Sequence, residues 1–125
     1  MQAVKALDND GVVAKAFYRA ADALGLSRQE IKDVIGLSEP TISRNLNSLQ
    51  KKQPVVFDAK TAECALFFIR IYRSLLAVVG GNENKARKWL EAENRYFGGT
   101  PRQHLKTLGG LIEVANYLDA MRGKV

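Results

Sequence analysis

The sequence contains very few of the residues that build disulfides and metal sites. Among 125 residues there is one cysteine, Cys64, and one histidine, His104. A single cysteine rules out an intramolecular disulfide framework and favours a reducing compartment, so we expect a cytoplasmic protein. One cysteine and one histidine cannot supply a zinc site of the usual type, so we expect no metal and no cofactor. Cys64 itself, among apolar neighbours, is interpreted as a small buried residue.

Recognisable catalytic groups are also missing. No serine or cysteine nucleophile has an evident base nearby in the sequence. The acidic residues are scattered through expected helix caps and helix faces, where structural roles explain them. His104 stands between Arg102 and Lys106, a setting typical of a surface histidine. An enzyme is therefore the class that the sequence supports least, and we expect no catalytic residues.

Proline and long apolar runs are scarce as well. The most apolar stretch, residues 64–79, is interrupted by Arg70 and Arg73 and is too short to span a bilayer. Residues 1–10 carry no apolar signal core. With 46% hydrophobic and 26% charged residues, the composition is that of an ordinary soluble globular protein.

Only three prolines occur, and the long segments between them have the apolar spacing of helices. We therefore expect an all-α fold of about seven helices. The expected helices are 10–24, 27–36, 38–53, 58–79, 82–93, a short one opening at Thr100, and a last one that follows Gly109-Gly110 and closes at Gly123. Residues 55–57 are expected to form an extended connector rather than a short strand. The expected division is a first domain over 1–53 and a second over 54–125.

Helix caps mark several of these starts. Asp10 is the expected N-cap of the first helix. Ser27 with Glu30 forms a capping-box pattern, and so does Thr100 with Gln103. Ser38, Asp58 and Asn82 are the expected N-caps of three other helices.

The junction between the second and third expected helices has the pattern of a helix-turn-helix. One glycine, Gly36, joins two short helices, and a turn this sharp requires positive φ. The outward side of the second helix carries small hydroxyl residues and one arginine near its start, which suits entry into the DNA major groove. The expected DNA-binding residues are Arg28, Ser38, Glu39, Thr41, Ser43, Arg44 and Asn47. A plain helical hairpin inside a bundle is the alternative.

The charge distribution gives this DNA-binding interpretation modest support. The net charge is +6, but residues 1–53 carry eight basic and six acidic residues, or only +2. Affinity from one such domain would be modest, so a dimer that binds two half-sites of a palindromic operator is expected. Helix 58–79 is apolar on two sides, which suits the domain centre or a dimer interface. The expected interface residues are Phe68, Tyr72, Leu75 and Leu76.

A second set of residues, near the C-terminus, has two possible roles. Arg95, Tyr96, Arg102, His104 and Lys106 cluster around an expected turn at residues 94–99, and they form either a solvated basic face or part of a partner surface. The basic tail of residues 121–125, with Arg122, Lys124 and Val125, is either a frayed terminus or an inhibitory element. Trp89 is most simply a core residue.

Two resemblances connect these observations. Residues 26–44 resemble the helix-turn-helix of the Xre/Cro-like repressors, with one departure: Lys32 stands where that family usually has alanine. The second resemblance, over roughly residues 60–125, is to the toxin-binding domain of the Xre/MbcA/ParS antitoxins. It rests on Lys88-Trp89-Leu90, Asn94, Phe97-Gly98-Gly99, Pro101, Leu105, Thr107, Gly109-Gly110, Val114, Leu118 and Gly123.

These resemblances imply an antitoxin. Such proteins neutralise a RES-domain toxin that consumes NAD, by direct binding that occludes its NAD pocket, and they repress their shared operon through the helix-turn-helix. By this implication the toxin-binding candidates are Arg95, Tyr96, Arg102, His104, Lys106, Arg122, Lys124 and Val125. The alternatives are a stand-alone Xre-like repressor without a toxin partner and a structural helical adaptor that never meets DNA.

Overall fold

The structure, a computed structural model, describes Asp8 and residues 11–124 of the chain. Over these residues it is all-α, as predicted, with seven helices and no strand. The helices are α2 (Val12–Ala23), α3 (Arg28–Ile35), α4 (Glu39–Gln50), α5 (Ala59–Val78), α6 (Glu83–Glu91), α7 (Pro101–His104) and α8 (Leu108–Arg122).

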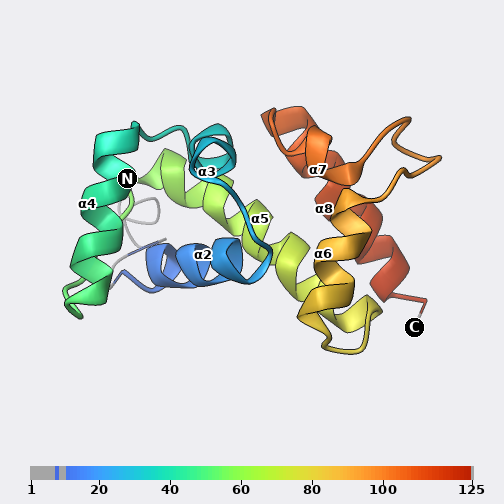
Figure 1. The fold of residues 1–125 in the computed structure, drawn as a ribbon, viewed down its shortest axis with the longest axis horizontal. Helices are drawn as coiled ribbons and strands as arrows, with labels where there is room; N and C mark the ends of the chain where they lie inside the picture. The colour runs from blue at the N-terminus through green and yellow to red at the C-terminus, as the bar shows by residue number, and fades with distance from the viewer. Residues whose placement is uncertain (1–7, 9–10, 125) are drawn as a thin grey trace.

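Helix α5 runs through the middle of the molecule and serves both halves. Figure 1 shows α2, α3 and α4 on one side of it and α6, α7 and α8 on the other. Its residues Phe68, Ile71 and Leu75 have no exposed surface. Phe68 packs edge-to-face on Phe17 of α2, with ring centroids 5.5 Å apart. On the α8 side, the buried Ser74 hydroxyl donates to a carboxylate oxygen of Asp119 at 2.8 Å. The domain boundary at residues 53 and 54 stays a prediction, because α5 contributes core residues to both halves.

The start of α2 differs from the prediction. Asp10, the expected N-cap, lies outside the described residues, and Gly11 stands at the cap position with φ 74°. The cap is supplied by Asp8, which is 2% exposed. Its carboxylate accepts from the N–H groups of Val13 at 2.9 Å, Ala14 at 3.3 Å and Phe57 at 2.8 Å. Asp8 thereby fixes the extended connector, residues 54–57, against the first turn of α2.

The other predicted caps are confirmed. Ser27 and Glu30 form a capping box, and Thr100 and Gln103 form another. The side chains of Ser38, Asp58 and Asn82 each accept from the N–H three residues on. These side chains satisfy N–H groups that a helix cannot pair internally, which is why their positions are readable in the sequence.

Helix α8 starts earlier than predicted and closes at Gly123 as predicted. The glycine pair does not precede the helix but lies in its first turn, because the Thr107 hydroxyl caps it by accepting from the Gly110 N–H at 3.1 Å. At the other end α8 continues to Arg122, and Met121 packs against the core. The free tail is therefore shorter than the predicted residues 121–125.

No single described helix is long and apolar enough to cross a membrane. Helices α5 and α6 together meet the length and composition of a span, but they bend by 112° at their junction.

The two glycines of α8 predict opposite responses to alanine. A Cβ on Gly110 would lie 1.9 Å from the His104 carbonyl oxygen, so the turn after α7 would have to move. A Cβ on Gly109 would meet nothing within 4 Å. We expect Gly110→Ala to lower the free energy of unfolding by about 2 kcal/mol or more. Gly109→Ala is the matched control and should be neutral or stabilising by up to about 1 kcal/mol. Equal urea midpoints for the two variants would contradict this account.

Candidate functional site

Helices α3 and α4 form the predicted helix-turn-helix. Gly36 adopts the left-handed conformation, φ 71°, and its N–H closes α3 on the Lys32 carbonyl at 2.8 Å. Ile42 of α4 is fully buried, and Leu37 packs half-buried against the core. Lys32, the departure from the family pattern, is exposed on α3. Its side chain therefore faces solvent and does not enter the core between the two helices.

A chain of polar side chains follows the outer side of α4. The Ser38 hydroxyl donates to the Thr41 hydroxyl at 2.9 Å, and Arg44 Nη2 donates to the same oxygen at 3.1 Å. Arg44 and Asn47 are exposed, and Ser43 is half-buried. The structure thus brings Ser38, Thr41 and Arg44 together in one row near the start of the helix.

Two of the predicted DNA-binding residues bind each other. Arg28 Nη1 of α3 and Glu39 Oε1 of α4 form an ion pair at 2.8 Å, with about half of each side chain exposed. Glu39 therefore does not stand free, and its charge is compensated. The sequence did not reveal a second link, in which Asn45 Nδ2 of α4 donates to the Tyr18 hydroxyl of α2 at 2.9 Å. That bond ties the middle of α4 to the helix behind it.

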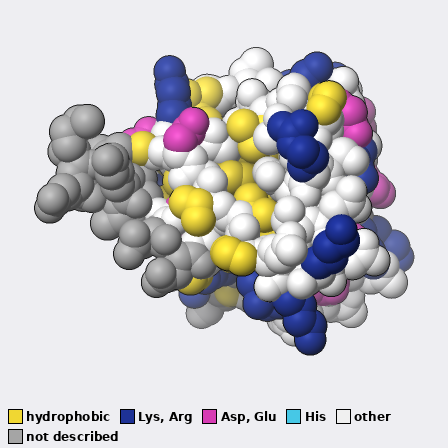
Figure 2. Space-filling model, turned by 90° about the vertical axis from the view of Figure 1, so that its left-hand side faces the viewer, with side chains coloured by type: hydrophobic (Ala, Val, Ile, Leu, Met, Phe, Trp, Pro, Cys, Tyr) yellow, Lys and Arg dark blue, Asp and Glu magenta, His cyan; other side chains and the backbone are white. Residues whose placement is uncertain are grey.

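The face that carries α4 is shown in Figure 2. Hydrophobic and uncharged atoms cover most of its centre, and separate Lys and Arg side chains stand around this area.

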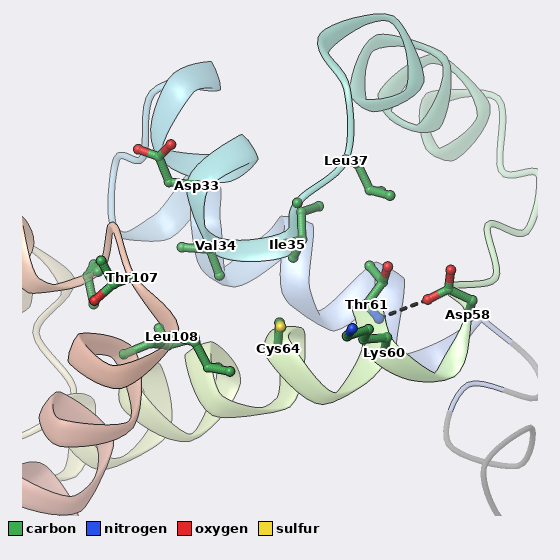
Figure 3. A pocket seen from close by; sticks show the side chains of 13 residues that line it. Asp33, Val34, Ile35, Leu37, Asp58, Lys60, Thr61, Cys64, Thr107 and Leu108 are labelled. Carbon is green, nitrogen blue, oxygen red and sulfur yellow. Dashed lines mark hydrogen bonds between the residues drawn. The ribbon is translucent and has the colours of Figure 1, made fainter.

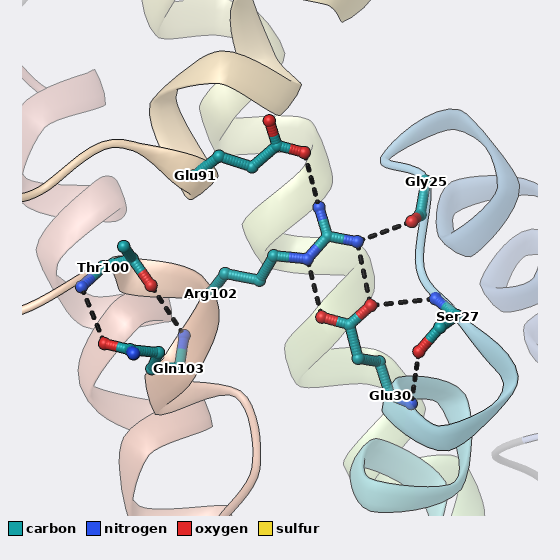
Figure 4. Close-up of polar contacts among 7 residues, drawn as sticks. All are labelled: Gly25, Ser27, Glu30, Glu91, Thr100, Arg102 and Gln103. Carbon is teal, nitrogen blue, oxygen red and sulfur yellow. Dashed lines mark hydrogen bonds and ion pairs between the residues drawn. The ribbon is translucent and has the colours of Figure 1, made fainter.

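In the second predicted site, Arg102 binds other parts of the chain and does not face a partner. This arginine is the second residue of α7, and only 18% of its side chain is exposed. Figure 4 shows its guanidinium reaching across to α3 and to the end of α2. Nε and Nη2 donate to the two carboxylate oxygens of Glu30 at 2.6 and 2.8 Å, and Nη2 also donates to the Gly25 carbonyl at 2.5 Å. Nη1 donates to Glu91 of α6 at 3.1 Å. Arg102 therefore joins the two halves of the molecule and is not a free cation on a partner surface.

Glu30 takes part in two structures at once. Its carboxylate accepts from Arg102 and also from the Ser27 N–H at 2.8 Å, which completes the capping box of α3. The hydrogen bond from Arg102, helped by those from Ser27 and opposed by burial, lowers the pKa of Glu30 to about 2. The carboxylate is therefore charged at neutral pH and locked between the two halves.

The remaining C-terminal candidates have separate environments. Tyr96 is 62% exposed and packs on Tyr117 of α8, with ring centroids 4.6 Å apart. His104 packs on Phe97 and lies 3.4 Å from Glu113. Arg95, Lys106, Arg122 and Lys124 are exposed, and Val125 lies outside the described residues. Trp89 is partly buried and stacks on Tyr117, which agrees with its interpretation as a packing residue.

Comparison with known families decides between the alternatives. Residues 3–70, more than half of the chain, match the model of the antitoxin Xre-like helix-turn-helix domain. The chain belongs to this antitoxin family. Residues 74–124 match a second model, the antitoxin Xre/MbcA/ParS C-terminal toxin-binding domain. The protein is thus an antitoxin of a toxin–antitoxin system, with a helix-turn-helix for DNA and a domain for a toxin partner. No curated protein matched the sequence.

The predicted dimer interface is wrong for two of its residues. Phe68 and Leu75 of the antitoxin have no exposed surface, because they fill the core between α5 and its neighbours. Tyr72 is half-buried, and its hydroxyl donates to Glu83 at 2.8 Å. Leu76 is half-buried against the core. Helix α5 is apolar on two sides because the two halves of one chain pack against it.

A cleft separates the turn of the helix-turn-helix from the α7–α8 connection. Figure 3 shows Ile35 and Leu37 on one side and Leu108 on the other, with Cys64 of α5 between them. The cavity is about 370 Å³. Cys64 is half-buried, not fully buried as predicted, and burial raises the pKa of its thiol. The cleft thus lies where the two family matches meet in space.

The Arg102–Glu30 bond predicts a loss of stability in acid. The pKa of Glu30 is about 2 in the folded antitoxin and about 4.5 in an unfolded chain. A group whose folded pKa is depressed stabilises the fold above its unfolded pKa, and this stabilisation is lost as the pH falls from about 4.5 to about 2. We expect a contribution of about 1–2 kcal/mol, since the pair is partly solvated. Urea unfolding between pH 7 and pH 2 should show this loss in the wild type and not in Glu30→Gln. Glu91→Gln is the control, and a loss of the same size in Glu30→Gln would contradict the assignment.

Proposed function

We propose that this antitoxin neutralises a RES-type, NAD-consuming toxin by direct binding that occludes its active site, and represses its own operon by binding operator DNA as a homodimer. One observation carries the proposal: a single chain of 125 residues joins the helix-turn-helix, residues 3–70, to the toxin-binding domain, residues 74–124. A stand-alone repressor would have no function for the toxin-binding domain.

The geometry of α4 supports base recognition by Arg44. Its guanidinium is exposed at the outer side of the helix, and its bond to the Thr41 hydroxyl leaves other donors for a base edge. Arginine binds the guanine edge through two donors, which is a common specific contact in the major groove. The hydroxyl of Ser38 and the N-terminus of α4 suit phosphate contacts.

The homodimer follows from the small size of this reading surface. One row of side chains on one short helix covers only a few base pairs, so two copies on a palindromic operator would supply the affinity. Tyr72 and Leu76, both half-buried on α5, are the remaining candidates from the predicted interface.

The toxin-binding residues that we propose are the exposed ones of the second half: Arg95, Tyr96, Lys106, Arg122 and Lys124, with Val125 at the end of the chain. Cations here suit a toxin whose pocket accepts an anionic nucleotide. Exposed tyrosines such as Tyr96 are typical of energetically important contacts in protein interfaces. Neither family matched is an enzymatic one, so we propose that the antitoxin acts by binding alone.

Neutralisation is tested by co-expressing the antitoxin with the RES-type protein encoded beside it. The toxin alone should deplete cellular NAD, and the wild-type antitoxin should restore it. Deleting residues 123–125, which follow α8, should let NAD fall again if the tail enters the toxin pocket, because the rest of the fold stays intact. Full protection by the shortened chain would remove the tail from the mechanism, and depletion despite the wild type would overturn the toxin assignment.

Operator binding is tested with Arg44→Ala. On duplexes selected for binding, fluorescence anisotropy should show a loss of about 1–3 kcal/mol and a relaxed preference at one base position. An equal loss on random DNA would make Arg44 a phosphate contact. The same titration gives the number of chains per duplex. Two chains per palindromic site are expected, and saturation at one chain would contradict the homodimer.

A further inference from the structure

The outer side of α4 carries little free charge. Of its charged residues, Glu39 is paired with Arg28 of α3. This leaves Arg44 as the exposed cation of the polar row on α4. Most of the affinity of a DNA-binding domain comes from cations that neutralise backbone phosphates. If the helix-turn-helix binds DNA, these cations must come from elements beside α4.

A cleft at the far end of α4 supplies them. It has a volume of about 630 Å³ and lies between α2 and the chain that leaves α4. Lys15 and Arg19 of α2 line one side, and Lys52 lines the other. All three are exposed, and none forms an ion pair with another described residue. No acidic side chain of the described residues lines this cleft.

Asp8, which binds both walls of the cleft, does not line it. Asp8 is connected to both walls, through Val13 of α2 and Phe57 of the connector. It is 2% exposed, and both of its oxygens accept backbone N–H groups. Its carboxylate is therefore occupied as a cap inside the fold, and the charged side chains among the described lining of the cleft are all cations.

Lys52 also breaks a local rule of helix endings. It is the single non-glycine residue with positive φ, 60°, among those described. Its N–H bonds to the Leu49 carbonyl and that of Gln53 to the Ser48 carbonyl, which is the Schellman ending of a helix. Glycine usually takes this position because a side chain there is strained. A lysine at a position that favours glycine costs backbone strain, which a functional role for its positive charge would explain.

We propose that Lys15, Arg19 and Lys52 form a phosphate clamp that holds the DNA backbone beside α4. The clamp rests on the proposed DNA binding. It supplies the positive charge that the polar row on α4 lacks. Asn45 of α4, bonded to Tyr18 of α2, keeps the two walls in register with the recognition helix. The occupant is a nucleic-acid backbone because three cations without an ion pair to another described residue, along one cleft beside α4, suit a line of phosphates.

The test is the salt dependence of binding to a random-sequence 30-bp duplex, followed by anisotropy from 50 to 300 mM KCl. Each phosphate contact contributes about 0.9 to the slope of log K against log salt. The triple variant Lys15→Gln, Arg19→Gln, Lys52→Gln should make this negative slope shallower by about 2–3. It should also weaken binding tenfold or more at 150 mM KCl.

The matched control removes three exposed cations from the toxin-binding half: Lys85→Gln, Lys88→Gln, Arg95→Gln. It lowers the net charge equally, and its slope should stay within about half a unit of the wild type. A wild-type slope in the clamp variant, or an equal loss in the control, would overturn the clamp while leaving DNA binding intact. No binding of any duplex by the wild type would overturn the proposed DNA function as well.

Lys52→Gly separates charge from folding. Glycine relieves the strained φ, so the variant should melt at a higher temperature than the wild type and yet bind DNA more weakly. Unchanged DNA affinity of this variant, at whatever melting temperature, would show that Lys52 serves only the helix end and would overturn its place in the clamp.

Discussion

The arrangement of the two halves depends on one arginine. Arg102 lies in the short helix α7, and its guanidinium binds the Glu30 carboxylate, the Gly25 carbonyl and Glu91. Glu30 caps α3, so the same carboxylate that starts the first helix of the DNA-reading pair also receives the toxin-binding half. The core around α5 brings the halves together through apolar packing. The planar fork of an arginine bound to both oxygens of a carboxylate fixes direction as well as distance.

This bond also changes what the net charge means. By sequence segment, the helix-turn-helix half carries only +2. In space, Arg102 from the other half compensates Glu30, Arg28 compensates Glu39, and Asp8 is buried as a cap. The cations that remain on the DNA-reading half are therefore less opposed than the segment count suggests. A charge balance taken along the chain was a poor measure of the field at this surface, because ion pairs join residues that are distant in sequence.

Features that depend on neighbouring residues could be predicted from the sequence. The capping boxes at Ser27 and Thr100 and the turn at Gly36 depend on residues within three or four positions, and all three appear as expected. Contacts between distant segments could not be predicted. Arg102 and Glu30 are 72 residues apart, and the N–H of Phe57 that Asp8 binds is 49 residues away. The predicted dimer contact met the same limit: Phe68 and Leu75 are buried in the core of one chain, Phe68 against Phe17 of α2, and their spacing on α5 could not show this.

The carboxylate of Asp8 makes the start of the chain part of the DNA-reading half. Its three acceptor bonds hold the first turn of α2 and the connector that follows α4. A protease that removed the first ten residues would leave those buried N–H groups without partners, at a cost of about 1–3 kcal/mol for each. The two walls that carry Lys15 and Lys52 would then lose their common anchor. Loss of Asp8 would thus destabilise the contact between α2 and the connector that follows α4, and the toxin-binding half would keep its own core around α5 and α8.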